Sequence, residues 1–212
     1  MIRLMVVDDH ELVRLGIRHI LAGYPSIRIV AEAGDGETAI RLNREVRPDV
    51  VLLDISLPGM SGLEVTTRLK QLEPKLGIII LTVHEAAPFP EKLLDAGASA
   101  YLTKGCPATE LVQAIRTVAK GKRHIGSSVA QQMALAMLNG TDKSPFDGLS
   151  AREMEVMLML VDGKRIADIA NIMHLSPKTV ATYKYRIFAK LETRSDVDMT
   201  RMAVRYGIVA SC

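Results

Sequence analysis

Five polar residues in the first half of the chain lie at the ends of short apolar runs that have the character of buried strands. They are Asp8, Asp9, Asp54, Thr82 and Lys104. Three carboxylates held close together repel one another, by about 4 kcal/mol per pair at 4 Å and an effective dielectric near 20. A hard cation such as Mg²⁺ removes this repulsion, because it binds through carboxylates, water and phosphate oxygens. The pattern therefore predicts a site that binds Mg²⁺ and a phosphoryl group.

The same residues suit phosphoryl transfer to a carboxylate. Asp54 would be the nucleophile, Mg²⁺ and Lys104 would neutralise the phosphoryl oxygens, and Thr82 would donate its hydroxyl. The expected product is an acyl phosphate on Asp54. Taken singly, each residue has an ordinary explanation: Asp8 and Asp9 as helix caps, Lys104 as a surface lysine. Their joint occurrence at the ends of several strands favours the site.

The elements that must position these residues are those of a doubly wound α/β domain, because residues 1 to about 120 alternate short apolar runs with helical periodicity. The five expected strands are 2–7, 27–31, 50–53, 78–81 and 100–103. Right-handed crossovers favour a parallel, flavodoxin-like sheet of strand order 2-1-3-4-5. Ligands of such sheets bind beyond the carboxyl ends of the strands, where the five polar residues lie.

The chain changes character after residue 120. Residues 121–148 form an expected linker, with an amphipathic stretch at 127–138 followed by a run of loop-forming residues. From 149 to 212 the pattern is helical only. Ser150 and Glu153 have the spacing of a capping box, and Ser176 followed by Pro177 predicts the start of another helix. We expect a first domain at 1–120, a linker at 121–148 and a small all-α second domain at 149–212.

Positive charge is concentrated between residues 164 and 191, where six basic residues accompany one acidic residue. Two short helices with a basic second helix are typical of a helix-turn-helix, which lays its second helix in the major groove of double-stranded DNA.

The expected inward residues are Val180, Tyr183, Ile187 and Leu191. Among the outward residues, Thr182 and Tyr185 could reach base edges and Ala181 a thymine methyl. Phosphate contacts are expected from Lys178, Thr179, Lys184 and Arg186. The alternative is a helical bundle with a solvated basic face, or a protein-docking domain.

Composition is compatible with this picture. The chain has 27 basic and 24 acidic residues, a net charge of +3 that does not by itself indicate nucleic-acid binding. Cys106 and Cys212 fit neither a disulfide framework nor a zinc site, which favours a reducing compartment. No apolar run approaches the roughly 18 residues of a membrane span, and no signal-peptide pattern is present. We therefore expect a cytoplasmic protein with no membrane partner, whose histidines are structural or face solvent.

The first 120 residues resemble the receiver domain of two-component response regulators. The motifs are Asp8-Asp9-His10, Asp54 followed by Leu57-Pro58-Gly59, Thr82, and Tyr101-Leu102-Thr103-Lys104. The resemblance implies that Asp54 accepts phosphate from a histidine of a sensor kinase. It also implies that Asp9, Asp54 and the carbonyl of Ser56 hold the metal, with Asp8 acting through water. Thr82 would then move toward the phosphate, and Tyr101 would turn inward.

The second half resembles the LuxR-type DNA-binding domain of NarL/FixJ regulators. The motifs include Leu149-Ser150-Ala151-Arg152-Glu153, Lys178-Thr179-Val180 and Ala189-Lys190-Leu191. Ser144-Pro145-Phe146-Asp147 and residues 183–188 are further similar to the GacA/UvrY group. This likeness implies a response regulator transcription factor, not an enzyme, with a BarA/GacS-type sensor kinase as partner. It implies a homodimer in the active state and activation of small regulatory RNA genes.

Two other functions are compatible with parts of the pattern. A haloacid-dehalogenase-type phosphatase also uses an aspartyl phosphate and Mg²⁺, but its nucleophile follows the first strand in an Asp-x-Asp arrangement, which this chain lacks. The chain could also be a phosphorylation-independent DNA-binding regulator with a vestigial receiver.

Overall fold

The computed structural model describes residues 1–83, 89–138 and 145–206. These residues form two compact units that divide after residue 135. Part of the expected linker, at 139–144, lies outside the described residues, as does Cys212. Among the helices in the described ranges, none is long and apolar enough to cross a membrane.

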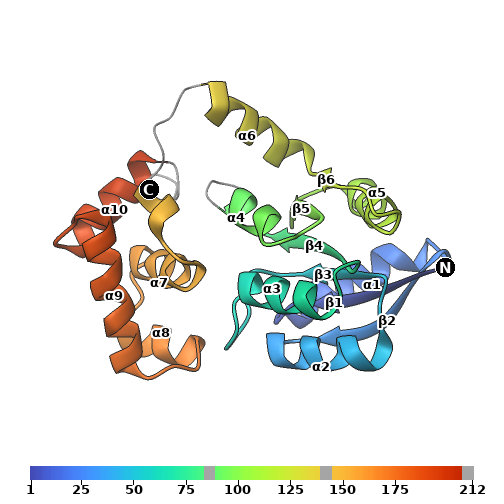
Figure 1. Ribbon diagram of the computed structural model, residues 1–212, viewed down its shortest axis with the longest axis horizontal. Helices are drawn as coiled ribbons and strands as arrows, with labels where there is room; N and C mark the ends of the chain where they lie inside the picture. The colour runs from blue at the N-terminus through green and yellow to red at the C-terminus, as the bar shows by residue number, and fades with distance from the viewer. Residues whose placement is uncertain (84–88, 139–144, 207–212) are drawn as a thin grey trace. The chain divides into compact units, whose positions relative to one another are not determined.

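The first unit is built on a parallel sheet (Figure 1). Its strands are β1 (Ile2–Val7), β2 (Ile27–Ala33), β3 (Val50–Leu53), β4 (Gly77–Thr82), β5 (Ala100–Thr103) and β6 (His124–Ile125). The strand order is β2-β1-β3-β4-β5-β6, so the predicted order of the first five strands is confirmed. The sequence did not predict β6, because a two-residue strand is too short to show alternation. It pairs with β5 at the edge of the sheet.

Helices cover both faces of this sheet, as alternating strands and helices require. They are α1 (Glu11–Ala22), α2 (Gly36–Val46), α3 (Gly62–Leu72), α4 (Phe89–Asp95) and α5 (Ala108–Val118). A further helix, α6 (Ser127–Leu138), follows β6 and runs past the boundary of the unit. Apolar residues of α1 and α5 pack on one face of the strands in a single core cluster. On the other face α2 and α3 meet so closely that a Cβ at Gly36 would lie 2.5 Å from Val65 Cγ2. All four residues of β3 are buried, as expected for a central parallel strand.

The second unit is helical. Its elements are the 3-10 turn η1 (Pro145–Gly148) and the helices α7 (Ala151–Val161), α8 (Ile166–Ile172), α9 (Pro177–Leu191) and α10 (Asp196–Arg205). The capping box of Ser150 and Glu153 is present at the start of α7, and Ser176 caps α9 ahead of Pro177, so both predicted starts are confirmed. Phe146 is fully buried, and its ring meets that of Tyr206 edge to face at 6.0 Å. Helices α8 and α9 form the expected helix-turn-helix.

Candidate functional site

The carboxylates at the ends of β1 and β3 converge at the carboxyl edge of the sheet. Asp8 and Asp54 are buried, with 2% and 3% of their surfaces exposed, whereas Asp9 and His10 are exposed. One ligand atom from each of these four residues lies within 4.8 Å of the other three. The group could hold a metal ion, and the carboxylate oxygens are those that Mg²⁺ prefers.

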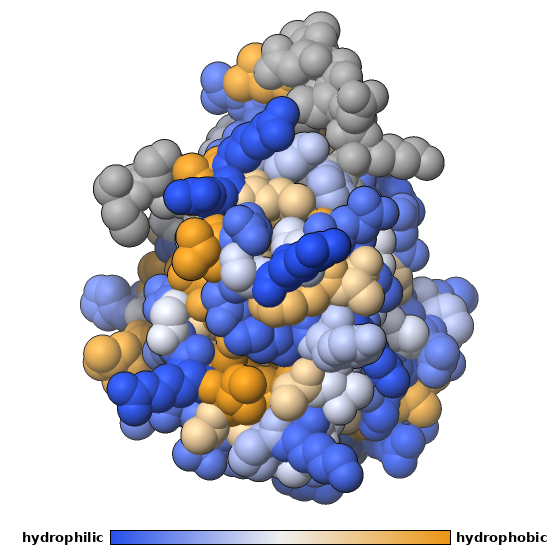
Figure 2. All heavy atoms as spheres, turned by 90° about the vertical axis from the view of Figure 1, so that its left-hand side faces the viewer, coloured by the Kyte–Doolittle hydropathy of each residue, from blue (hydrophilic) through white to orange (hydrophobic). Residues whose placement is uncertain are grey.

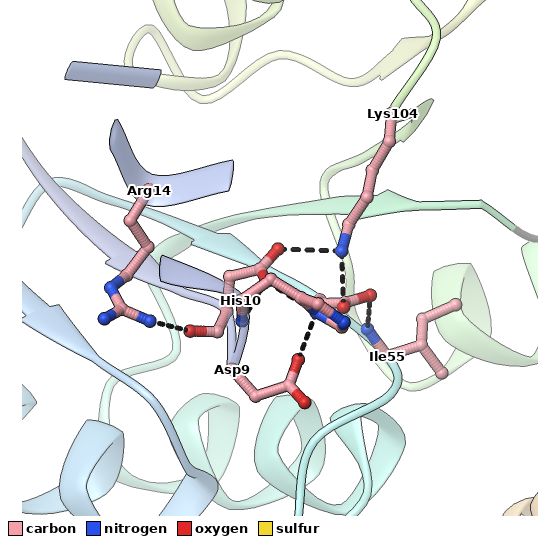
Figure 3. Close-up of polar contacts among 7 residues, drawn as sticks. Asp9, His10, Arg14, Ile55 and Lys104 are labelled. Atoms are coloured by element: carbon pink, nitrogen blue, oxygen red, sulfur yellow. Dashed lines mark hydrogen bonds and ion pairs between the residues drawn. The ribbon is translucent and has the colours of Figure 1, made fainter. Parts of the chain in front are cut away.

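Lys104 reaches this group from the end of β5, and Figure 3 shows its amine directed at the carboxylates. Its Nζ lies 2.7 Å from Asp54 Oδ2 and 2.8 Å from Asp8 Oδ2. Burial opposes the charged form of Lys104, but the hydrogen bonds and charges of Asp54 and Asp8 outweigh it, and the pKa of the amine is raised. The ammonium therefore stays charged at neutral pH and bridges the two acids.

The loop after β3 fixes the Asp54 side chain. The N–H of Ile55 donates to Asp54 Oδ1 at 2.7 Å, and the N–H of Gly62 donates to the carbonyl of Ile55 at 3.0 Å. A Cβ at Gly62 would lie 2.6 Å from Ile55 Cα and 2.7 Å from the carbonyl oxygen of Asp54, so only glycine fits where α3 begins. Ser56 is exposed beside this loop.

Thr82 and Tyr101 lie on neighbouring strands next to the site. Both are fully buried. The backbone N–H of Lys104 donates to the carbonyl of Thr82 at 2.7 Å, which joins the ends of β4 and β5. Tyr101 lies within β5, and its side chain is enclosed by the unit.

Two residues of the site were not predicted. His10 is exposed, which agrees with the prediction that the histidines are structural or face solvent, but no contact with the acidic pair was predicted for it. Its Nδ1 lies 2.7 Å from Asp9 Oδ1, and its backbone N–H donates to Asp8 Oδ1 at 2.8 Å (Figure 3). Arg14 donates from Nη1 to the carbonyl of Asp8 at 2.6 Å. The contacts of His10 could have been expected, because His10 follows the acidic pair directly in the sequence. The contact of Arg14 depends on the first turn of α1, which brings its side chain back to the carbonyl of Asp8.

The outward face of α9 is the second candidate site. Lys178, Ala181, Thr182, Tyr185 and Arg186 are all exposed, as predicted, and 77% of the Tyr185 surface is accessible. The inner positions Val180, Ile187 and Leu191 are buried, and Tyr183 is half-buried. Figure 2 looks onto the side where Figure 1 draws α9 and α10, and this surface is mostly hydrophilic with apolar patches between.

The structure divides the basic residues of α9 into two groups. Lys184 Nζ lies 2.6 Å from Asp196 Oδ2, and Lys190 Nζ lies 2.6 Å from Glu153 Oε2. Within the described ranges, Lys178 and Arg186 take part in no ion pair. Thr179 is held in the cap of α9, where its N–H donates to Ser176 Oγ at 3.1 Å. Of the four basic residues of α9, Lys178 and Arg186 are thus the two without an acidic partner in that part of the chain.

Comparison with known proteins covers both units. Residues 4–116 match the response regulator receiver domain family, and residues 147–203 match the family of bacterial regulatory proteins described as luxR. Response regulator GacA of Pseudomonas viridiflava is 47% identical over 210 residues, which span 99% of this chain and 98% of the relative. Response regulator UvrY of Escherichia coli (strain K12) is 46% identical over 209 residues, 98% of this chain and 96% of the relative.

Solved structures resemble the chain over nearly its whole length. A structure of two RcsB dimers bound to two parallel DNAs is 25% identical, with a TM-score of 0.60, over 95% of this chain and 96% of that one. The two family matches and the full-length relatives agree with the receiver-like sheet and the helix-turn-helix described above. The chain therefore belongs to the LuxR-type response regulators, transcription factors that join a receiver domain to a DNA-binding domain and are not enzymes.

Proposed function

We propose that a sensor histidine kinase phosphorylates Asp54 and that this modification controls DNA binding by the C-terminal helices. The observation that carries the proposal is the position of Lys104 Nζ, 2.7 Å from Asp54 and 2.8 Å from Asp8. An ammonium held there can neutralise the oxygens of an arriving phosphoryl group. An Asp54 carboxylate oxygen would attack phosphorus, the bond to the kinase imidazole nitrogen would break, and that nitrogen would take up a proton.

The acidic group fits Mg²⁺, because its donors are clustered carboxylates. In this proposal Asp9, Asp54 and the carbonyl of Ser56 hold the ion, and Asp8 acts through water. When bound, the ion would supply further neutralisation of the phosphoryl oxygens. Asp8 also holds Lys104 in place through its Oδ2.

Thr82 and Tyr101 would transmit the modification. The Thr82 hydroxyl would move toward a phosphoryl oxygen and donate to it, and the space that it leaves would favour the inward position of Tyr101 on the neighbouring strand β5. Both side chains are buried, so a change at either one alters packing rather than solvent exposure. The change would reach the surface through α4 and β5, which contact each other.

The DNA-binding part of the proposal uses α9. Thr182 and Tyr185 would reach base edges and Ala181 a thymine methyl, while Lys178, Thr179, Lys184 and Arg186 would contact phosphates. A homodimer would bind double-stranded DNA, as the RcsB dimers do in their DNA complex. By likeness to GacA and UvrY, we propose a BarA/GacS-type kinase as the upstream partner, small regulatory RNA genes as targets, and the cytoplasm as the place of action.

The proposed domain organisation is a receiver at 1–120, a linker at 121–148 and a DNA-binding domain at 149–212. The two family matches, which end at residue 116 and begin at residue 147, support it.

Incubation of the full chain with acetyl phosphate and Mg²⁺, followed by intact-mass measurement, tests the proposal. Wild type should gain the mass of one phosphoryl group, and Asp54→Asn should gain none. Equal modification of both proteins would show that Asp54 is not the acceptor.

A second measurement, promoter occupancy of Asp54→Ala, separates this function from a phosphorylation-independent regulator. Occupancy should fall in the variant, and unchanged occupancy would favour the vestigial receiver.

A further inference from the structure

Lys184 and Asp196 form an ion pair between the recognition helix and the start of the next helix. Lys184 Nζ lies 2.6 Å from Asp196 Oδ2, with the two side chains 23% and 50% exposed. The same ammonium lies 5.4 Å from the centre of the Phe188 ring, within the range of a cation–π contact. Lys184 is therefore held by two partners of its own chain.

The other acid in the first turn of α10 is engaged differently. Ser195 caps the helix and donates from its hydroxyl to Asp198 Oδ2 at 2.7 Å, while the N–H of Asp198 donates to Ser195 Oγ. Asp196 and Asp198 thus have the same charge and lie on the same helix turn, but their polar contacts are with different residues. This difference supplies a matched pair for experiment.

We propose that Asp196 competes with DNA phosphate for Lys184 and so lowers sequence-independent binding. The proposal rests on the proposed DNA-binding function of α9. Phosphate contacts carry most non-specific affinity, and each one releases about 0.9 counterions on B-DNA. A lysine neutralised by its own carboxylate contributes little to that release. Because a half-exposed ion pair is worth about as much as a single surface contact, Lys184 is divided between Asp196 and phosphate in the wild-type complex.

This competition leaves the other proposed DNA contacts of α9 in place. Lys178 and Arg186 would still position the helix, since no acid of the described residues neutralises them. Base contacts from Thr182 and Tyr185 do not depend on Lys184. Holding one lysine back therefore weakens binding to any DNA and leaves the base contacts that read the sequence unchanged.

The test measures binding of the full chain to a labelled, mixed-sequence DNA duplex by fluorescence anisotropy over a series of KCl concentrations. Asp196→Asn should raise affinity about two- to five-fold at low salt. It should steepen the slope of log Kobs against log salt by up to about 0.9. Asp198→Asn changes the net charge equally and is the matched control, so it should leave the slope close to that of wild type. In a Lys184→Gln background, Asp196→Asn should alter the slope no more than Asp198→Asn does.

Three results would overturn the inference. If Asp196→Asn leaves the slope unchanged and only lowers the midpoint of thermal unfolding, the pair is a structural tie between α9 and α10. If Asp198→Asn steepens the slope as much, the effect is one of general charge. If wild type shows no salt-dependent DNA binding, the proposed function of α9 fails and the inference falls with it.

Discussion

The ammonium of Lys190 lies 2.6 Å from Glu153 Oε2, which ties the last turn of α9 to the capping box that starts α7. Lys190 also donates to the carbonyl of Gly148 at 3.1 Å. The Glu153 carboxylate also accepts a hydrogen bond from the backbone N–H of Ser150 at 2.7 Å. A single buried carboxylate thus joins three segments of the DNA-binding unit.

Glu153→Gln should destabilise this unit. The amide can still accept from Ser150, but Lys190 loses its charged partner, and we expect the free energy of unfolding to fall by about 1–2 kcal/mol. Urea unfolding of the full chain, followed by circular dichroism, measures the loss. Glu192→Gln is the matched control, because Glu192 is exposed and the charge change is the same. An equal effect of the two substitutions would contradict the structural role of Glu153.

The same carboxylate should make the unit sensitive to acid. Burial opposes ionisation of Glu153, but the hydrogen bonds from Lys190 and Ser150 outweigh it, and the pKa lies below its usual value of 4.5. A group with a lowered folded-state pKa stabilises the fold above its unfolded pKa, and this contribution is lost as the pH falls through the folded value. Unfolding free energies measured from pH 7 downward should therefore drop below about pH 4.5 in wild type and drop less in Glu153→Gln. Parallel curves for the two proteins would contradict this.

Lys104→Met should increase the affinity of the acidic group for Mg²⁺. The ammonium competes electrostatically with a cation for Asp8 and Asp54, so its removal should tighten binding several-fold. Because the chain has no tryptophan, isothermal titration calorimetry is a suitable measurement. Lys75→Met, at an exposed position between α3 and β4, controls for the change in net charge. Weaker Mg²⁺ binding in Lys104→Met would show that the lysine supports the metal site rather than competing with it.

Gly62→Ala should disturb the loop that follows Asp54. The new methyl would meet Ile55 Cα and the Asp54 carbonyl inside van der Waals contact, so we expect a loss of about 1–3 kcal/mol and slower modification by acetyl phosphate. Gly16→Ala in α1 meets nothing within 4 Å and should stabilise the chain by about 0.5–1 kcal/mol. The two variants can be compared by urea unfolding and intact-mass time courses. Normal modification of Gly62→Ala would mean that the loop tolerates displacement.

Local patterns in the sequence were sufficient for the helices and strands that carry the site. The alternation of apolar runs and helical stripes predicted the strand order, because crossover handedness leaves few topologies for such a chain. The polar residues at the strand ends were predicted to converge since parallel strands share one carboxyl edge. The caps at Ser150 and Ser176 were predicted because a cap involves residues within one turn of each other.

Contacts between distant parts of the chain required the tertiary structure. Strand β6 exists because β5 offers its free edge, where the N–H of Gly126 donates to the carbonyl of Tyr101 at 2.9 Å.

The sequence alone was enough to predict the order of the first five strands, the helix-turn-helix and the number of basic residues in α9. Only the structure showed that Lys184 and Lys190 are paired with acids 12 and 37 residues away. A count of charged residues does not reveal these two ion pairs. Spacing along one helix predicts only partners three or four residues away, whereas these partners are brought together by the packing of different helices.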